Sequence, residues 1–432
     1  MKIGFYAIQG VAYAITDPMF VMLLIILGIS FYKKNRRTVM MQKMIIGEGL
    51  NSSLELTISQ IVLGILGGAI GSLILSYLGV SFPNNSVIYM LFLLSIILMF
   101  VNHKYICFSY SGALLGLITL TMKLVGDFLG IKTSEYIQLN IVSLMTLVGV
   151  MHVVEGFLVM IDGSKGAIPV FANKDEKIMG GFALNRYWAV PIAIMLMFSK
   201  ELVMDVTKEQ LITPSWWPLI HGGITETLLK SSILAITPFY AVVGYNSITF
   251  TKSKKRKSLI SGLLILSYGI ILSLVAQLAS FGYLAQLVVL IFAPIAHEGM
   301  LFLDTYFEIK GEAKYTSSEE GIMVLEVAPN SPAQEMGIES GDLLIEVNNK
   351  SIDSEKDIFE NLRELQNFLW LKVKKGTGEI KEIYYNSMTK DKRLGVVFVP
   401  KSIAGDDKFI KYKGSSKKNF KDILDSMKGK EK

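Results

Sequence analysis

The sequence predicts an all-α polytopic membrane bundle that is followed by a small soluble α/β domain. Three observations predict this class. The chain of 432 residues is 51% hydrophobic and only 19% charged, its mean hydropathy is +0.45, and its apolar residues come in long uncharged runs. A run of about 18 or more apolar residues is long enough to cross the hydrocarbon core as a helix. The region after Asp304 instead mixes apolar and charged residues as soluble domains do.

The first residues predict a short helix that ends at Asp17-Pro18. They resemble a signal peptide in the spacing of Ala12 and Ala14, but they carry one lysine and another apolar segment follows at once. Proline breaks a helix that precedes it. We therefore expect an uncleaved helix that lies at the interface or is partly inserted.

Further apolar segments fill the chain up to residue 310. The candidate spans are 18–32, 57–79, 86–102, 105–128, 138–160, 188–204, 219–244, 258–280 and 283–303. We expect about eight or nine spans in residues 1–310, depending on whether the first helix crosses the membrane.

Charged loops predict the orientation of these spans. The connections at 32–43, 102–104, 165–186 and 251–257 are basic, and they alternate with poorly charged loops at 79–85 and 212–218. Basic loops belong in the cytoplasm, where they complement anionic lipid. The same alternation places everything after Asp304 in the cytoplasm. Trp216 and Trp217 would then be interfacial anchors on the far side.

A glycine pair and the single cysteine both have ordinary structural interpretations. Gly67-x-x-x-Gly71 forms a face on which a second helix packs closely, and we favour packing inside the bundle over a seam between two copies, which leaves a homo-oligomer as the alternative. The single cysteine, Cys107, excludes an intramolecular disulfide, and we expect no cysteine-based metal site.

The soluble part divides into a polar linker (311–318), one domain (319–400) and a lysine-rich tail (401–432) with ten lysines and five acids. Strand-like alternation begins at Gly321, and a Pro-containing turn with a short helix follows it. A second helix presents Ile358, Leu362 and Leu365 on one face. Two strands joined by "GTGE" and a last short strand, "RLGVVFVP", complete the domain.

An ordered set of residues resembles the bacterial type of PDZ domain: Ser331, Pro332, Ala333, Gly337, Gly341, Asp342 and Asn348. The resemblance implies a permuted strand order in which the carboxylate-binding loop, Leu394-Gly395, comes last. A peptide would add to the edge formed by Val396, Val397 and Phe398 and reach towards Ile358 and Leu362. A rigid spacer, or a groove filled by a neighbouring segment, is the alternative.

The membrane part is similar to the MinJ family of cell-division topology proteins in Firmicutes. The similarity rests on Asp17–Arg37, Gly180–Pro191, Gly244–Ser258 and Phe292–Gly299, with the PDZ domain in last position. The resemblance implies a non-enzymatic adaptor without a cofactor, which links a DivIVA-type polar scaffold to MinD and is enriched at septum and poles.

An intramembrane protease, or a protease regulator with a PDZ sensor, is the main alternative. A zinc protease needs His-Glu-x-x-His, but Leu301 stands where the second ligand would follow His297-Glu298. His152 and His297, with a carboxylate such as Glu155 or Asp304, are the candidates for a metal site of another kind. We expect His297 near the cytoplasmic end of the last span, in a structural role.

Other activities have weaker signals. The sequence contains no Gly-x-Ser-x-Gly nucleophile motif and no phosphate-binding glycine loop. A transporter would need a polar midplane site, for which His221, Glu226 and Lys230 are the candidates. The basic runs are explained by lipid, so we expect no nucleic-acid partner.

Overall fold

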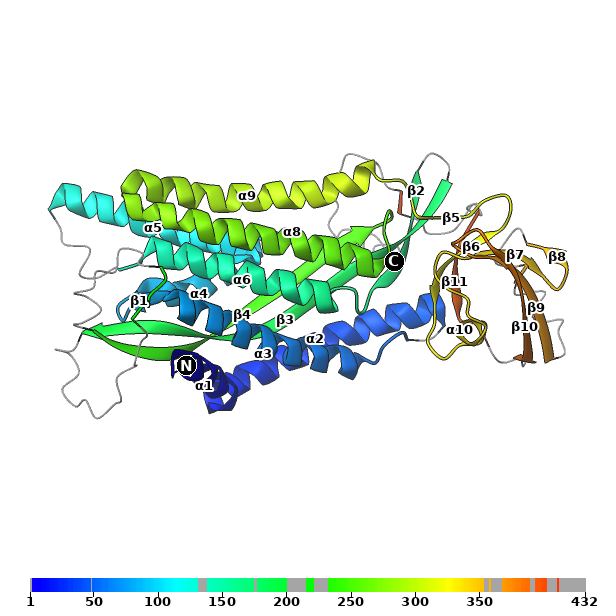
Figure 1. Ribbon diagram of the computed structural model, residues 1–432, viewed down its shortest axis with the longest axis horizontal. Coiled ribbons are helices and arrows are strands. Elements are labelled where there is room, and N and C mark those ends of the chain that lie inside the picture. The colour runs from blue at the N-terminus through cyan, green and yellow to red at the C-terminus, as the bar shows by residue number, and fades with distance from the viewer. Residues whose placement is uncertain are drawn as a thin grey trace.

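The computed structural model describes residues 2–47, 49–130, 138–174, 177–199, 215–220, 232–352, 357–358, 367–388, 393–401 and 410–411. The helices form an elongated bundle with the terminal domain at one end (Figure 1). The expected fold class, a helical membrane part followed by a small α/β domain, is confirmed.

The first two helices meet at the predicted break. Helix α1 (Lys2–Thr16) ends before Asp17, whose carboxylate caps α2 (Pro18–Ile46) by accepting from the backbone N–H groups of Met19 and Phe20. Pro18 suits the first turn of α2 because the N–H it lacks would have no partner there. α2 is longer than the predicted span, because it continues through the basic segment to a left-handed cap at Gly47.

Within the described ranges, six helices are long and apolar enough to cross a membrane, and the chain is therefore a multi-pass membrane protein. They are α2, α3 (Ser53–Leu78), α5 (Phe108–Leu129), α6 (Ile141–Asp162), α8 (Lys254–Val275, continued by η5, Ala276–Phe281) and α9 (Tyr283–Lys310). Shorter elements connect α3 to α5: β1 (Ser81–Pro83), η1 (Val87–Tyr89), α4 (Met90–Val101) and η2 (His103–Ile106).

Helix α6 lies at the centre of the bundle and is buried on nearly all sides. Glycines let it approach α8 at backbone distance. A Cβ on Gly156 would lie 2.6 Å from the carbonyl oxygen of Gly262, and one on Gly269 would lie 2.5 Å from that of Gly149. Lipid supplies no hydrophobic driving force for helix association. Small residues at such crossings allow close van der Waals packing, which stabilises the helix pair instead.

Two of the predicted spans are wrong. Their described residues 188–199 and 232–244 belong to a long antiparallel hairpin of β3 (Lys177–Ser199) and β4 (Ser232–Thr249), which pair from Phe182–Thr249 to Ser199–Ser232. The hairpin runs along the bundle beside α3 (Figure 1). β3 also pairs with β1, with β2 (Ile168–Lys174) and with β5 (Tyr315–Thr316).

Helix α3 covers the part of the β3 edge that these strands leave open. Cβ atoms on Gly64 and Gly68 would lie 2.0 and 1.9 Å from the carbonyl oxygens of Ala189 and Pro191. Ser72 accepts the N–H of Ala193 at 2.8 Å. Non-helical backbone is tolerated at membrane depth only where protein buries it. The glycine face of α3 provides that burial.

The predicted small-residue face packs inside the bundle, as favoured. Cβ atoms on Gly67 and Gly71 would each lie 3.0 Å from Val154 of α6.

The two tryptophans predicted as interfacial anchors differ in burial. Trp217 is buried and donates from Nε1 to the carbonyl of Ser76, which corrects its placement at an interface, whereas Trp216 is half exposed.

The terminal domain is a sheet with the strand order β10-β9-β7-β6-β11. Its elements are β6 (Ile322–Val327), α10 (Pro332–Glu335), β7 (Leu343–Val347), β8 (Lys350–Ser351), β9 (Asn367–Lys374), β10 (Ile380–Met388) and β11 (Val396–Val399). Ser331 caps α10, and the left-handed Gly337 follows it (φ +72°). The predicted turn, short helix and closing strand are thus present.

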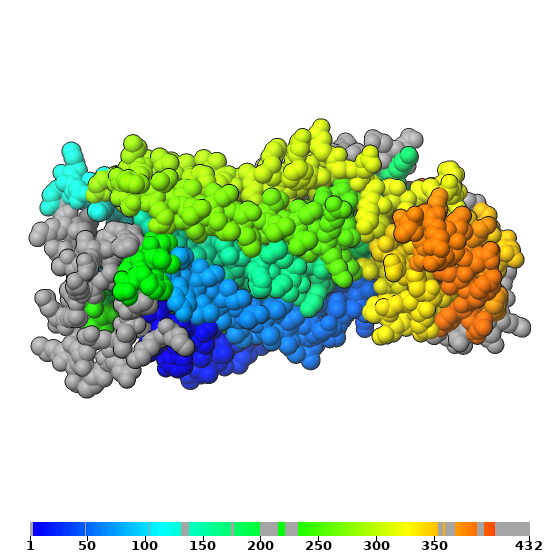
Figure 2. All heavy atoms as spheres, viewed as in Figure 1, coloured from blue at the N-terminus to red at the C-terminus, as the bar shows by residue number. Residues whose placement is uncertain are grey.

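The domain packs directly on the bundle, and its yellow-to-orange surface covers one end of the molecule (Figure 2). Leu325, Val397 and Val399 belong to the same apolar cluster as the bundle core. β5, which lies inside the segment predicted as a linker, pairs with β3. Most of the lysine-rich tail lies outside the described residues, apart from β12 (Ile410–Lys411), which pairs with β2.

Candidate functional site

The last strand of the terminal domain, β11, lies at the edge of the sheet. Among the described strands it pairs only with β6, in antiparallel register. Its partner residue Val324 uses its backbone N–H and C=O on the β7 side, where it bonds Asp342 and Gly341. Val324 therefore makes no ladder bond to Phe398, and the backbone N–H and C=O of Phe398 point outward. On this side the backbone of β11 is thus unpaired among the described strands.

The loop before β11 aims further N–H groups in one direction. The carbonyls of Leu394 and Gly395 accept hydrogen bonds from Ala333 and Ala328. Because a trans peptide places its N–H opposite its C=O, the N–H groups of Gly395 and Val396 point away from that segment. Gly395 has a φ of +74°, the left-handed conformation that occurs in anion-binding nests. The geometry suits a carboxylate.

Side chains of β11 are divided between two cores. Val396 and Phe398 pack in the core of the domain with Leu394 and Ile358. Val397 faces the bundle and belongs to the membrane core instead. Of the predicted groove residues that it describes, the structure thus brings the side chains of Leu394, Val396, Phe398 and Ile358 together and turns that of Val397 towards the bundle. Leu362 lies outside the described residues.

Arg393 is a site residue that the sequence reasoning missed. It is exposed beside the loop, and its guanidinium lies over Gly47, where a Cβ would be 2.6 Å from Nη1. Gly47 is the C-cap of α2, an end at which a cation is favoured. The arginine therefore contacts the bundle from the position just before the Leu394-Gly395 loop. Its position just before Leu394-Gly395 is the signal that could have identified it.

Ionisable groups on β9 form one partly buried and one exposed ion pair. A hydrogen bond of 2.8 Å and the charge of Glu346 raise the pKa of Lys372. A hydrogen bond of 2.7 Å and the charge of Lys374 lower the pKa of Glu320. Both lysines belong to β9, which β7 and β6 separate from β11. These pairs therefore lie away from the outer edge of β11.

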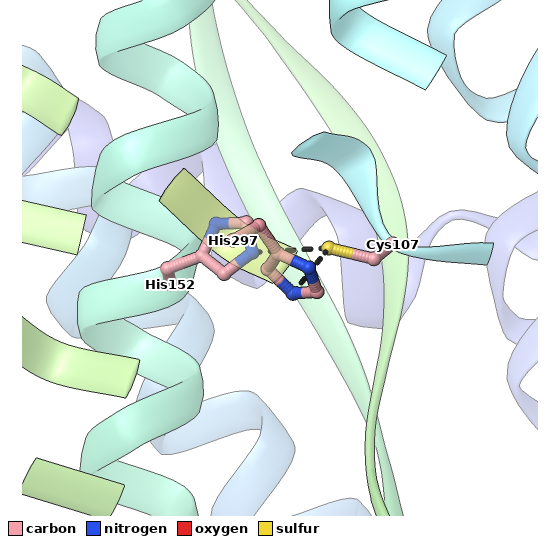
Figure 3. Close-up of side chains that lie close together, drawn as sticks. All are labelled: Cys107, His152 and His297. Atoms are coloured by element: carbon pink, nitrogen blue, oxygen red, sulfur yellow. Dashed lines mark hydrogen bonds between the residues drawn. The ribbon is translucent and has the colours of Figure 1, made fainter. Parts of the chain in front are cut away.

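A second group of functional side chains lies inside the bundle. His152 and His297, the two candidate metal ligands, meet there together with Cys107 (Figure 3). The Sγ atom of Cys107 lies 3.0 Å from Nε2 of His152 and 3.5 Å from Nε2 of His297. One cysteine can therefore join two histidines, which corrects the expectation that no metal site could include it.

The neighbours predicted for His297 need correction as well. α9 runs on to Lys310, so His297 lies near the middle of the helix and is 7% exposed, which contradicts a water-exposed place at its end. Asp304 does not join the histidines; it pairs with Lys257 at 2.8 Å. His221, Glu226 and Lys230, the transporter candidates, lie outside the described residues.

Comparison with known proteins identifies the terminal domain. The family model described as "PDZ domain" matches residues 323–369. The terminal domain is a PDZ domain. The matched residues include the turn, α10, β7 and the start of β9, and β11, one of the two edge strands of the sheet, follows them in the chain.

Curated relatives are similar over short segments. The chain is 30% identical to "Serine protease HTRA1" of Xenopus tropicalis over 74 residues and 38% identical to "Serine endoprotease DegS" of Haemophilus influenzae over 55 residues. It is 24% identical to "Probable cell division topological determinant MinJ" of Lacticaseibacillus paracasei over 66 residues. No solved structure matches significantly.

These matches cover a small part of each protein. They span 17%, 13% and 15% of this chain, and 16%, 16% and 18% of the respective relative. Together with the PDZ domain, they support a MinJ-like, PDZ-containing membrane protein.

Proposed function

We propose that this protein is a non-enzymatic membrane adaptor that recruits protein partners through its PDZ domain during placement of the division site. The resemblance to the MinJ family implies the partners, a DivIVA-type polar scaffold and a MinD-type protein. The outward backbone edge of β11 next to the Leu394–Val396 loop carries the proposal, because it offers a strand and a carboxylate complementary hydrogen bonds.

The charge distribution supports a cytoplasmic PDZ domain. The basic start of α8 lies at the PDZ end of the bundle, where Lys254 forms an ion pair with Glu326 of β6. The basic second half of α2 leads to Gly47, which contacts Arg393. Positive residues next to membrane spans favour the cytoplasmic side, and there they meet anionic lipid.

Proteolysis receives little support from the arrangement of α9. The position one turn after His297 that a zinc protease needs for its second histidine holds Leu301, which is 37% exposed. The serine proteases among the relatives match over no more than 74 residues, and the sequence has no Gly-x-Ser-x-Gly motif. A PDZ domain that senses substrates for a separate protease is the alternative function.

Arg393 is the best residue with which to test the groove. Leu394 is buried in the PDZ core and Gly395 is confined by Ser331, so changes at either residue would disturb the fold itself. Arg393→Glu reverses an exposed charge next to the Leu394-Gly395 loop. Lys381→Glu makes the same change of charge on β10, at the opposite edge of the sheet.

The experiment is affinity purification from membranes of the bacterium that encodes the chain, with both variants and the wild type at equal amounts. We expect DivIVA-type and MinD-type proteins to copurify with the wild type and with Lys381→Glu, and to be lost with Arg393→Glu. Circular dichroism and gel filtration verify that the variants are folded. Equal recovery with all three proteins would contradict partner capture at β11.

A further inference from the structure

The group formed by Cys107, His152 and His297 has a geometry close to that of a metal centre. Its three donor atoms come from three elements and all lie within 4.8 Å of one another. A tetrahedral zinc ion with ordinary bond lengths holds sulfur and nitrogen ligands about 3.6 Å apart. The observed sulfur–nitrogen distances are 3.0 and 3.5 Å, shorter than this by about 0.6 and about 0.1 Å. Small side-chain rotations would therefore complete the geometry.

The surroundings of His152 leave its Nε2 free to bind a metal. Its Nδ1 lies 2.8 Å from the backbone carbonyl oxygen of Val148, one turn earlier in α6. A carbonyl only accepts hydrogen bonds, so Nδ1 carries the proton and Nε2 keeps its lone pair. This is the outer hydrogen bond that orients histidine ligands in metal sites.

His297 has the same tautomer for a different reason. Tyr110 donates its hydroxyl proton to Glu298 at 2.6 Å, and Lys104 neutralises that carboxylate. The Tyr110 oxygen can therefore accept from Nδ1 of His297, which lies 3.1 Å away. Nε2 of His297 is left with its lone pair towards Cys107, and the chain from histidine through tyrosine to Glu298 forms a second outer shell.

Without a cation, Cys107, His152 and His297 share too few protons to hydrogen-bond one another. Two imidazole lone pairs face one thiol, and the thiol has a single proton to donate. Cys107 is also the N-cap of α5, and its Sγ accepts from the N–H of Ser109 at 3.5 Å. Helix N-termini favour a thiolate. A cation would satisfy all three donor atoms at once.

We infer that this protein binds a transition-metal ion of the zinc class through Cys107 Sγ, His152 Nε2 and His297 Nε2, and that the ion ties the start of α5 to α6 and α9. Binding replaces the thiol proton, which is released to solvent, with a metal–sulfur bond. Sulfur and imidazole ligands select zinc-like ions over magnesium or calcium. The inference is independent of the PDZ groove.

Aromatic rings enclose the centre. Tyr268 lies edge-on to both imidazoles, with ring centroids 4.8 Å from His152 and 5.5 Å from His297. The Tyr268 hydroxyl is engaged elsewhere, with Ser109 at 2.7 Å and the Ala293 carbonyl at 2.8 Å. Three protein ligands leave a further coordination position, and Glu155, one turn after His152 on α6, is the nearest carboxylate of that helix in sequence.

The test uses the full chain, purified in detergent without chelator and then loaded with Zn²⁺ or Co²⁺. We expect about one zinc ion per chain by elemental analysis. Co²⁺ should give the near-ultraviolet charge-transfer absorption of a thiolate ligand together with the visible bands of a tetrahedral site. Zinc should raise the unfolding temperature by a few degrees, because it binds the folded chain preferentially.

Variants assign the ligands. Cys107→Ser and His297→Ala should lower the zinc affinity by at least about 100-fold, and Cys107→Ser should abolish the charge-transfer band. Tyr110→Phe keeps all three ligands but removes the acceptor for Nδ1 and the hydrogen bond to Glu298, and it should weaken binding by about 10-fold. The control is Thr121→Val, an exposed position on α5 about 20 Å along the helix from Cys107, which should keep full metal content.

A result on the wild type alone can overturn the inference, even if the variants do not fold. Reconstituted wild type without stoichiometric zinc, or with Co²⁺ bands that lack the thiolate transition, would do so. Equal alkylation of Cys107 by a maleimide in the presence and absence of zinc would also contradict it, because a metal-bound thiolate is protected. Retention of zinc by a folded Cys107→Ser variant would have the same meaning.

Discussion

At the scale of single residues, a buried ion pair fixes the end of α6 to the hairpin. Arg186 and Asp162 are both almost fully buried, and Nε of Arg186 donates to the Asp162 carboxylate at 3.0 Å. Trp188 donates to the same carboxylate oxygen at 3.0 Å. The guanidinium also reaches Ser59 of α3 at 2.7 Å. The pair thus joins three elements.

Asp162→Asn should destabilise the protein by about 3–5 kcal/mol, because it leaves the Arg186 charge buried without its counterion. Lys165→Ala is the matched control, since Lys165 contacts the same carboxylate at 3.2 Å but is 44% exposed. Its loss should cost no more than about 1 kcal/mol. Denaturant unfolding in detergent measures both values, and equal losses would disprove the role given to the buried pair.

Gly395→Ala should unfold the PDZ domain locally. The residue has a φ of +74°, and a Cβ would lie 2.3 Å from Cβ of Ser331. We expect a loss of about 2–5 kcal/mol from backbone strain and overpacking together. Gly378→Ala is the control: its φ is +91°, but no atom lies within 4 Å, so only strain of about 1–2 kcal/mol applies. Hydrogen exchange of β6 should rise clearly only in Gly395→Ala.

The sequence predicted part of the group formed by Cys107, His152 and His297. It selected His152 and His297 because ionisable groups in spans are functional suspects. It excluded Cys107 because one cysteine suggests neither a disulfide nor a sulfur-rich site. The cysteine lies 45 residues before His152 and 190 before His297, and only the packing of α5, α6 and α9 brings them together. No local spacing could have shown this.

At the scale of elements, the hairpin of β3 and β4 is the main departure from the predicted helices. A continuous apolar run does not distinguish a buried strand from a buried helix, because both faces are apolar in either case. Residues 188–196 are all buried, so β3 shows no alternation. Pro191 within the run was the available sign against a helix. The spans at α3, α5, α6, α8 and α9 were found because length and hydropathy suffice for isolated apolar helices.

The glycine face of α3 should tolerate no side chain. Gly64→Ala and Gly68→Ala would each force a Cβ to about 2 Å from a carbonyl oxygen of β3, so α3 would have to move from the strand edge. We expect poor insertion or a loss of at least about 3 kcal/mol for each. Gly299→Ala on α9 meets nothing within 4 Å and should be neutral or stabilising by about 1 kcal/mol.

Protein yield and thermal stability in detergent measure these effects. If Gly64→Ala and Gly68→Ala were as stable as Gly299→Ala, the close contact between α3 and β3 would be wrong. The measurement therefore tests the hairpin itself, since a helix at 188–204 would present side chains instead of open carbonyl groups to α3.

At the scale of the whole molecule, the PDZ domain is held against the bundle. Val397 and Val399 of its edge strand share the apolar cluster of the membrane part, and a Cβ on Gly180 of β3 would lie 2.6 Å from Val399. Lys254 and Glu326 add an ion pair across the same contact. The bundle therefore fixes the direction in which the outer edge of β11 faces.

A cysteine crosslink of short, fixed length can detect this docked arrangement. In a Cys107→Ser background, Lys254→Cys with Glu326→Cys should be joined by a short bifunctional maleimide in native membranes, because the linker replaces the length of the two side chains that form the ion pair; a direct disulfide is not needed for this. Lys254→Cys with Glu320→Cys should not, since Glu320 pairs with Lys374 of β9. Similar rates for the two pairs would show that the domain moves freely.

The most direct test of the account is the location of fluorescently tagged protein in dividing cells. The wild type and Lys381→Glu should be enriched at septum and poles, whereas Arg393→Glu should spread evenly over the membrane, because it reverses the charge next to the loop that leads into the proposed peptide-binding edge. A variant Arg393→Glu that is folded and still concentrates at the septum would contradict recruitment through β11.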